Sequence, residues 1–281
     1  METLKEAFKT KYPAYADRIL NKFEKANNCE ANWENMTKPN LSKFVTSIQR
    51  EVARSSARTY GAMFKSVLNL YSEEIDLPRG FNEILTVKKD VSQNIYLTDE
   101  EVQKIIDYEP ESDTERVIRN QFILGCLTGA RHSDYIMFTR ENIFGKNLKY
   151  VSKKTHIEAE MPLSPAVKRV IRENETYGFV GLEYSLTYFN QAIKNICQKV
   201  DITENMKLYQ GGEYVTSEKW SFASSHTARR SFATNLYLRG ADLYLISRLM
   251  GHTSVEQSKN YICANIENLS QEVTDFFSNF N

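Results

Sequence analysis

Six side chains suited to phosphodiester chemistry occur in four short segments of the chain. The segments are TGARHSD at 128–134, KKT at 153–155, SSHTARRSFATNL at 224–236 and LMGHTSVEQSKNY at 249–261. Two arginines, two histidines, a lysine and a tyrosine stand out in them: Arg131, Arg229, His226, His252, Lys154 and Tyr261. The set contains no cage of carboxylates, so it predicts a reaction on one phosphate that needs neither a metal nor a cofactor.

Each of these residue types has a defined use at a phosphate. The guanidinium group of arginine binds two non-bridging phosphate oxygens at once and stays charged at any physiological pH. A tyrosine hydroxyl can act as a covalent nucleophile, although its ordinary pKa of about 10 requires a base or a positive field. A lysine on a hairpin tip can protonate the leaving oxygen. Phosphodiester bonds are very inert. Electrostatic stabilisation of the pentacoordinate phosphorane is the one contribution large enough to lower the barrier to their cleavage.

Taken singly, these residues have ordinary explanations. His226 could cap a helix, His252 follows a glycine in a turn between helices, and Tyr261 is one of 16 tyrosines. Lys154 is one residue of a charged hairpin and has Lys153 beside it. Their joint order and spacing favour a common site, which the separate explanations do not account for.

The elements expected to position these residues are mostly helices. Apolar residues at steps of three and four predict helices over 14–26 and 41–71, followed by a turn at 76–82 and an extended segment at 83–96. Thr98 and Glu101 form a capping-box pattern that opens a helix. Further helices are expected near 98–108, 114–128, 132–138, 164–175, 186–199, 226–238, 241–250 and 254–263.

Two antiparallel hairpins interrupt this helical pattern. Residues 148–164 alternate apolar and polar side chains, and a second hairpin is centred on Gly211 and Gly212. The tail, 264–281, has apolar residues at alternating steps of three and four, which predicts an amphipathic helix too short to be stable alone. The fold class expected is therefore mainly α with a small antiparallel sheet, and the tail should dock on this chain or on a neighbouring protomer.

Charge is balanced overall but uneven along the chain. There are 36 basic and 36 acidic residues, yet residues 38–65 hold six basic residues against Glu51 alone. Arg50, Arg54 and Arg58 would form one stripe on a continuous helix, either a DNA-contacting face or a solvated one. The DNA contacts predicted from this segment are Lys43, Arg50, Arg54, Arg58 and Lys65.

Other sequence features restrict the class of protein. No window approaches 18 consecutive apolar residues, and the N-terminus has no secretory pattern, so neither a membrane span nor export is expected. The four cysteines are far apart, which favours reduced thiols over disulfides or a zinc site. These features predict a cytoplasmic protein.

In its chemical segments the chain resembles the tyrosine recombinases, also called the phage integrase family. The family pattern runs T-G-x-R-x-x-E/D, a Lys eight residues before a Pro, H-x-x-R, L-G-H, and a Tyr nine residues after that His. The matching residues are Thr128-Gly129-Ala130-Arg131 with Asp134, Lys154 before Pro162, His226-Thr227-Ala228-Arg229, Met250-Gly251-His252 and Tyr261. The match covers about residues 97–263. It departs where Arg230 replaces a frequent His, Met250 a frequent Leu and Asp134 the commoner Glu.

The resemblance implies a mechanism. Tyr261 would attack the scissile phosphate and leave a 3′-phosphotyrosine and a free 5′-hydroxyl, while Arg131 and Arg229 stabilise the phosphorane. His226 and His252 would donate hydrogen bonds or move protons, and Asp134 would orient Arg131. Lys154 would be the general acid, with Lys153 as the alternative.

The resemblance also implies an organisation and partners. Residues 1–90 would form a helical core-binding domain, 91–96 a linker, 97–263 the catalytic domain and 264–281 a protomer-docking tail. The expected partner is double-stranded DNA with a specific target site, bound by a homotetramer at the nucleoid of a bacterial or phage-infected cell, with accessory DNA-bending proteins as further partners. The leading hypothesis is a site-specific recombinase. The alternatives are a type IB topoisomerase-like nicking-closing enzyme and a catalytically silent DNA-binding regulator.

Overall fold

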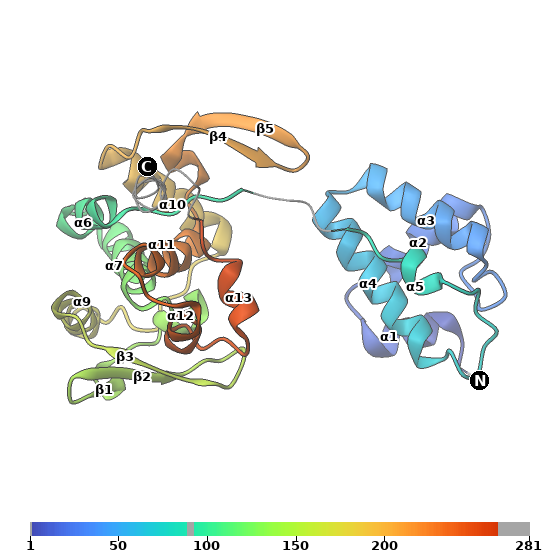
Figure 1. Ribbon diagram of the computed structural model, residues 1–281, viewed down its shortest axis with the longest axis horizontal. Coiled ribbons are helices and arrows are strands. Elements are labelled where there is room, and N and C mark those ends of the chain that lie inside the picture. Colours follow the sequence, from blue (N-terminus) through green and yellow to red (C-terminus); the bar gives the residue numbers. More distant parts are fainter. Residues whose placement is uncertain (1, 89–92, 264–281) are drawn as a thin grey trace, which may run out of the picture. The chain divides into compact units, whose positions relative to one another are not determined.

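The computed structural model describes residues 2–88 and 93–263 (Figure 1). The chain divides into an N-terminal unit, residues 1–92 with the short segment Tyr209–Glu213, and a C-terminal unit that begins at Gln93 and contains the rest. Both are mainly helical, and small antiparallel sheets occur in the second, so the predicted fold class is confirmed. The tail predicted at 264–281 lies outside the described residues.

The N-terminal unit is built from helices around an aromatic centre. Its helices are α1 (Leu4–Lys11), α2 (Ala16–Asn27), α3 (Lys38–Glu51), α4 (Arg54–Leu70) and the short α5 (Phe81–Ile84). The ring of Phe64 in α4 packs against Phe8, Phe23 and Phe44, with centroid distances of 5.0, 5.6 and 4.9 Å. Because these three rings come from α1, α2 and α3, one cluster ties the four long helices together.

The prediction of one continuous helix over 41–71 is wrong. Helix α3 ends at Glu51, and Val52 has extended backbone angles before α4 begins at Arg54. The Glu51 carboxylate lies 2.8 Å from the ammonium of Lys22 in α2, which holds the end of α3 against its neighbour. Arg50 is therefore on a different helix from Arg54 and Arg58, and the predicted single stripe does not form.

The five basic residues predicted to contact DNA occupy two helices of this unit. Lys43 and Arg50 are exposed on α3, and Arg54 and Arg58 are exposed in the first turns of α4. Lys65, farther along α4, donates from its ammonium to the hydroxyl of Thr86 at 3.0 Å. A DNA-binding role for this group stays a proposal.

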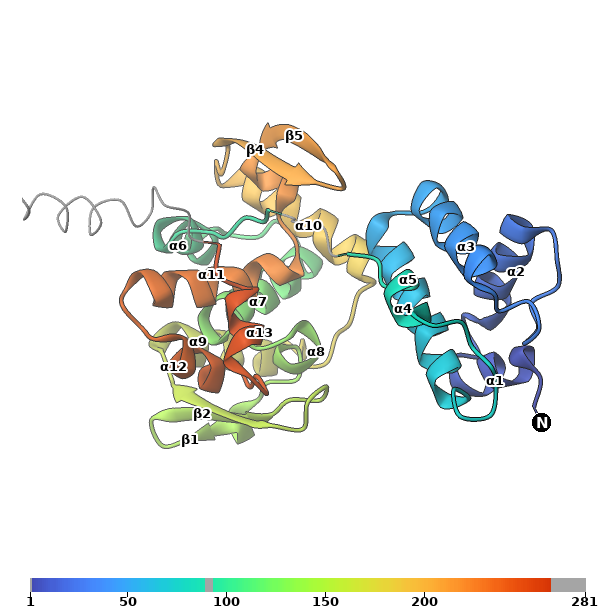
Figure 2. The ribbon, with the colours of Figure 1, turned by 45° about the vertical axis from the view of Figure 1, so that its right-hand side comes forward.

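The C-terminal unit surrounds a central helix, α7 (Figures 1 and 2). Its helices are α6 (Asp99–Asp107), α7 (Asp113–Thr128), α8 (His132–Tyr135), α9 (Pro165–Thr176), α10 (Leu186–Lys199), α11 (Ser225–Leu238), α12 (Leu243–Leu249) and α13 (Val255–Lys259). Helix α7 packs closely on α11 because Gly125 faces Ala228, where an added Cβ would approach the Ala228 Cβ to 2.8 Å. This close crossing places the end of α7 beside the start of α11.

Two hairpins complete the C-terminal unit. Strands β2 (Asn147–Val151) and β3 (Glu158–Pro162) pair in antiparallel fashion, and β1 (Ile143–Phe144) adds a third strand that the sequence pattern does not predict. Strands β4 (Asn205–Gln210) and β5 (Glu213–Glu218) are joined by Gly211 and Gly212. Both glycines have positive φ, 62° and 102°, as a two-residue hairpin turn requires.

Several local predictions are confirmed and others need correction. The capping box of Thr98 and Glu101 opens α6, and α10 has the predicted bounds. Helix α8 ends at Tyr135 rather than near 138, and α13 ends at Lys259 rather than near 263. Ile95, placed in the predicted 91–96 linker, is 3% exposed in the core of the C-terminal unit.

No described helix is both long enough and apolar enough to cross a bilayer. Within residues 2–88 and 93–263, the histidine, cysteine, aspartate and glutamate side chains form no group of three arranged to hold a metal ion.

Candidate active site

Arg229 is the buried centre of the candidate site. It lies in the first half of α11, is 1% exposed, and extends toward the turns that end α7 and α12. Its Nη1 donates to the Gly129 carbonyl, and its Nη2 lies 3.5 Å from the Met250 carbonyl and 2.7 Å from Nε2 of His252. Residues from three distant segments are thus joined by one guanidinium.

The contacts of His252 determine its tautomer. A guanidinium can only donate, so Nε2 of His252 accepts from Arg229 and the ring proton is on Nδ1. Nδ1 then donates to the hydroxyl of Ser258 at 2.8 Å. Burial, followed by the positive charges of Arg229 and Arg131, lowers the pKa of His252 to about 4. The ring is therefore neutral at pH 7 and points its lone pair at Arg229.

Tyr261 lies against both of these residues. Its ring stacks on His252, with centroids 5.2 Å apart and planes 28° apart, and the guanidinium carbon of Arg229 is 5.0 Å from its centroid. The backbone of the same segment is fixed by Thr234 of α11, whose hydroxyl donates to the Tyr261 carbonyl at 3.3 Å and accepts from the Cys263 amide at 3.0 Å. The phenol is half-buried and held in the positive field of the arginine.

Arg131 reaches the site from the start of α8. Gly129 ends α7 with φ 62°, and Arg131 is the residue that precedes α8. The chain turns here at a glycine because an added Cβ would lie only 2.3 Å from the ring of Phe232. Arg131 and Arg229 are close enough that each positive charge lowers the pKa of His252.

A buried serine connects Arg131 to Asp134. The hydroxyl of Ser152, fully buried, accepts from Nη1 of Arg131 at 2.8 Å and donates to one carboxylate oxygen of Asp134 at 3.0 Å. The other Asp134 oxygen accepts from the backbone amide of Lys153 at 2.9 Å. Asp134 is therefore linked to Arg131 through Ser152. It also fixes the backbone at Lys153, where the turn of the β2–β3 hairpin begins.

Sequence reasoning missed Ser152. It stands next to the KKT segment, between strand β2 and the turn, but a lone serine carries no motif. Its position directly before two lysines in a hairpin is the only signal that could have drawn attention to it.

The β2–β3 hairpin brings its tip to the His252 turn. The hydroxyl of Thr155 donates to the Gly251 carbonyl at 3.3 Å, and an added Cβ at Gly251 would lie 3.6 Å from that of Ala159. Lys153 and Lys154 are both exposed beside this contact. The hairpin can therefore present either ammonium at the rim of the site.

His226, one turn before Arg230 on α11, faces the same rim. Its ring is exposed, and partial desolvation together with the charges of Arg230, Arg229, Lys154 and Arg131 lowers its pKa. Four cations from α8, α11 and the hairpin thus act on one imidazole. Such a field attracts an anion and keeps the ring neutral in its absence.

The arrangement can bind and stabilise a single phosphate. Arg131, Arg229 and His226 supply donors on one side, the hairpin lysines lie at the rim, and the Tyr261 phenol lies against Arg229. In the part of the chain that the structure describes, no carboxylate contacts Arg229, and its charge is met by carbonyls, an imidazole lone pair and an aromatic ring. A dianionic phosphorane would be a stronger partner than any of these.

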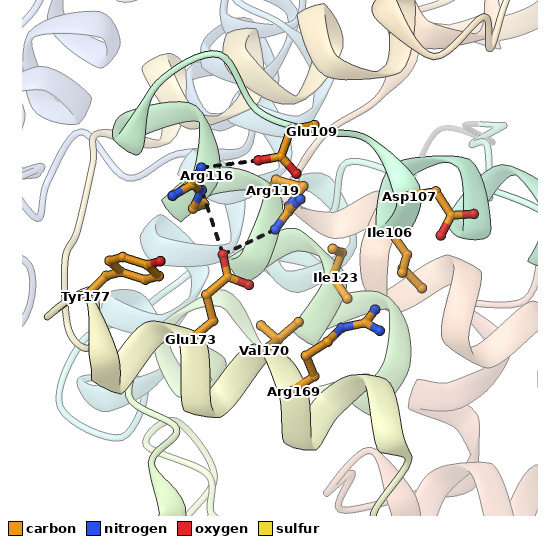
Figure 3. A pocket seen from close by; sticks show the side chains of 10 residues that line it. All are labelled: Ile106, Asp107, Glu109, Arg116, Arg119, Ile123, Arg169, Val170, Glu173 and Tyr177. Carbon is orange, nitrogen blue, oxygen red and sulfur yellow. Dashed lines mark hydrogen bonds and ion pairs between the residues drawn. The ribbon is translucent and has the colours of Figure 1, made fainter.

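A separate polar cleft of about 440 Å³ lies between α6, α7 and α9 (Figure 3). It is lined by Arg116, Arg119 and Glu173, among other residues, and these three form an ion-pair network with distances of 3.5 and 3.8 Å. None of the six predicted catalytic residues lines this cleft. Arg116 and Arg119 pair with Glu109 and Glu173 across this cleft, which gives that part of it the character of a structural junction.

Comparison with known proteins settles the family. The model of the phage integrase family matches residues 95–267, more than half of the chain. The chain belongs to the phage integrase family. The resemblance inferred from its motifs is confirmed.

The relatives of this phage integrase family member include a phage integrase and a bacterial tyrosine recombinase. The integrase of Escherichia phage P2 is 26% identical over 175 residues, which are 62% of this chain and 44% of the phage protein. Tyrosine recombinase XerD of Pasteurella multocida is 24% identical over 214 residues, 74% of this chain and 71% of XerD. The chain thus spans less than half the length of the P2 integrase.

Solved structures of other integrases have the same fold. The integrase of transposon Tn1549 in complex with transposon right end DNA matches with a TM-score of 0.71 at 11% identity, over 98% of this chain and 99% of that one. A lambda integrase dimer bound to a COC′ core site matches with a TM-score of 0.66 at 16% identity, over 92% and 95% of the two chains.

Proposed function

We propose that this family member is a site-specific DNA recombinase, an enzyme that cleaves and rejoins DNA strands through a 3′-phosphotyrosine. The observation that carries the proposal is the meeting of Arg229, His252 and Tyr261, from separate elements, with the phenol ring stacked on the imidazole and over the guanidinium. Family membership supports the same chemistry.

In the proposed reaction the Tyr261 phenol gives its proton to the neutral imidazole of His252, and its oxygen forms a bond to phosphorus as the bond to the 5′-oxygen breaks. Arg131 and Arg229 bind the non-bridging oxygens, and His226 donates from the exposed rim. Lys154 gives its proton to the departing 5′-oxygen, with Lys153 as the alternative donor. The phosphoester energy is retained in the phosphotyrosine, so a 5′-hydroxyl of a partner strand can reverse the step.

Substrate binding must rearrange the contacts of Arg229 and His252. In the described state the Nη2 donors of Arg229 serve the Met250 carbonyl and His252, and Nε2 of His252 has no proton. When a phosphate takes over Arg229, Nε2 becomes free to accept a proton, and the imidazolium can then donate to the phosphate. His252 would thus act on the phosphate only after DNA has bound.

Asp134 and Ser152 act as positioning residues in this scheme. Their shared contacts link the guanidinium of Arg131 to the backbone of Lys153. The phosphate-binding arginine and the proton-donating lysine would therefore move together.

The proposed partner is duplex DNA with a specific target site, bound by four protomers in synapsis. Lambda integrase has been solved as a dimer on a core site and as a tetramer on a Holliday junction. The basic residues of α3 and α4, Lys43, Arg50, Arg54, Arg58 and Lys65, are proposed to contact the backbone of that DNA. We place the protein with the nucleoid DNA in the cytoplasm, with DNA-bending proteins as accessory partners.

The proposal is tested by trapping the covalent intermediate. A target site is first selected by binding from a random-sequence duplex pool, and a nicked version of it is then incubated with protein and denatured in detergent. Wild-type protein should give a DNA-shifted band, and Tyr261→Phe should bind the DNA but give no band. Arg131→Ala and Arg229→Ala should each reduce the band's rate of formation by about 10²-fold or more. Absence of the band with wild-type protein would refute the proposal.

The topoisomerase-like alternative shares this covalent step and differs in assembly. Deleting residues 264–281 should abolish recombination between two sites while sparing some cleavage of the nicked substrate, if the tail docks protomers together. Full recombination by the deleted protein would rule out that role of the tail.

A further inference from the structure

Arg230 is a half-buried cation that lacks a carboxylate partner among the described residues. Its Nε is buried and has no hydrogen-bond partner there. Burial lowers the pKa of Arg230, and the groups that oppose this effect, Cys263 and Tyr261, are a thiol and a phenol rather than carboxylates. Within residues 2–88 and 93–263, no anion therefore compensates for the desolvation of this side chain.

Arg119 shows what a structural arginine in this chain looks like. It is 8% exposed, its Nε and Nη2 donate to the Asn120 amide oxygen at 3.1 and 2.8 Å, and its Nη1 donates to the Tyr108 carbonyl at 2.6 Å. Nη2 also lies 3.5 Å from the Glu173 carboxylate (Figure 3). Buried polar groups are nearly always satisfied in this way, since an unpaired one costs free energy. Arg230 is thus a site at which a partner is expected.

The position of Arg230 on α11 indicates what that partner is. It follows His226 by four residues and precedes Thr234 by four, so the three share one helix face. Thr234 fixes the backbone of Tyr261 and Cys263, and His226 lies on the rim of the phosphate site. Arg230 therefore stands between the phosphate site and the segment that carries the nucleophile.

The spacing suits a second phosphate of the same strand. Four residues of α-helix rise about 6 Å, and phosphates follow one another at about 3.4 Å along the axis of a DNA strand. A strand that follows α11 therefore carries more than one phosphate over this rise, and the phosphate next to the one at His226 and Arg229 would lie on the Arg230 side.

We propose that Arg230 binds a DNA backbone phosphate adjacent to the one that Tyr261 attacks. This inference rests on the proposed function, because it places DNA over the face of α11. An arginine carries a full charge at pH 7, whereas the histidine frequent at this family position would be largely neutral. The contact would hold the strand beside the nucleophile before and after cleavage.

The test measures reversible DNA binding in a Tyr261→Phe background, so that its result does not depend on cleavage. Arg230→Met removes the charge at similar volume, and its affinity for a short fluorescent duplex is titrated between about 50 and 200 mM salt. Binding should weaken about tenfold, and the slope of log K against log salt should fall in magnitude by about 0.9. Arg239→Met is the matched control, because it removes the same charge from the exposed end of α11, and it should change neither quantity.

Thermal stability without DNA separates a ligand contact from a structural role. Arg119→Met should lower Tm because the Asn120 amide oxygen and the Tyr108 carbonyl lose their donor, whereas Arg230→Met should keep Tm or raise it because no partner is lost. Unchanged affinity and salt slope in Arg230→Met would overturn the inference, as would a loss of Tm like that of Arg119→Met or a failure to fold. A missing covalent adduct in wild-type protein would instead overturn the proposed function.

Discussion

The neutral state of His252 makes the site sensitive to acid. Two cations and burial keep the imidazole unprotonated in the folded protein down to about pH 4, while an unfolded chain would protonate it near pH 6.5. Between these values the unfolded state binds the extra proton, so the free energy of unfolding must fall as the pH falls. The difference between the folded and unfolded pKa values of His252 corresponds to a loss of about 3 kcal/mol at most in the free energy of unfolding.

We expect His252→Gln to flatten this pH dependence. Wild-type protein should lose stability more steeply than the variant between pH 6.5 and about 4, because the variant has no proton to bind at this position. Denaturant unfolding at a series of pH values measures the two slopes, and the contribution of His226 is common to both proteins. Parallel curves would show that His252 is not held neutral by its contacts.

The two adjacent lysines can be distinguished by the leaving group. Lys154→Ala should slow cleavage of an ordinary phosphodiester by about 10²- to 10⁴-fold. A substrate with a 5′-phosphorothiolate should restore the cleavage rate of this variant, because a thiolate leaves without a proton. Lys153→Ala should show a small effect and no rescue. If rescue occurs with Lys153→Ala instead, the general acid is Lys153.

Some residue-level features could be predicted from the sequence and others could not. The spacing of Arg131, Arg229, His252 and Tyr261 indicated a common site, and the structure brings Arg229, His252 and Tyr261 into contact. The tautomer of His252 depends on which atom faces Arg229, and the link through Ser152 depends on the hairpin's register. Neither feature can be predicted from the sequence, because both depend on the three-dimensional arrangement of the side chains.

At the scale of elements, the turn from α7 to α8 sets the position of Arg131. Gly129 has φ 62° and faces the ring of Phe232, whereas Gly145 has φ 61° with nothing within 4 Å of an added Cβ. The two glycines therefore share a backbone conformation and differ in the space around them.

Gly129→Ala should destabilise the protein much more than Gly145→Ala. A left-handed conformation costs an alanine about 1–2 kcal/mol at either position, and overlap with Phe232 adds about 1–3 kcal/mol at Gly129 alone. Urea denaturation of both variants measures the difference, and cleavage by Gly129→Ala should fall because Arg131 shifts. Equal destabilisation of the two variants would mean that the Phe232 ring moves aside with no measurable cost in free energy of unfolding.

Elements with local signals were predicted well from the sequence. The capping box at Thr98, the glycine pair at 211–212 and the apolar periodicity of α10 each act within a few residues. The break after Glu51 has no such signal, because Val52 and Ala53 are neither glycine nor proline, and the contact at this helix end, the ion pair of Glu51 with Lys22, joins residues far apart in the sequence. Strand β1 has two residues, too few for an alternating pattern.

At the scale of the whole molecule, each unit has its own hydrophobic core. Phe8, Phe23, Phe44 and Phe64 belong to a buried cluster whose described members all lie in the N-terminal unit. The cluster extends to Leu85 and Val87, at the end of the described part of that unit. Over residues 93–263, no residue of the C-terminal unit contributes to it.

We expect residues 1–88 to fold as an isolated fragment. A unit of this size with its own core commonly unfolds in one cooperative step. Circular dichroism should show a helical spectrum and a sigmoidal melt, and Phe64→Ala should lower its stability by about 3–5 kcal/mol, as expected for an aromatic core residue. A fragment without a cooperative transition would show that this core depends on the rest of the chain.

The central claim is that Tyr261 forms the bond to DNA within a site assembled from distant segments. The most direct test is to digest the trapped protein–DNA complex and identify by mass spectrometry the peptide that carries the nucleotide. We predict that the modified residue is Tyr261, and that the linkage is a tyrosine phosphodiester to a 3′-end. A nucleotide on any other residue, or a linkage to a 5′-end, would contradict the account.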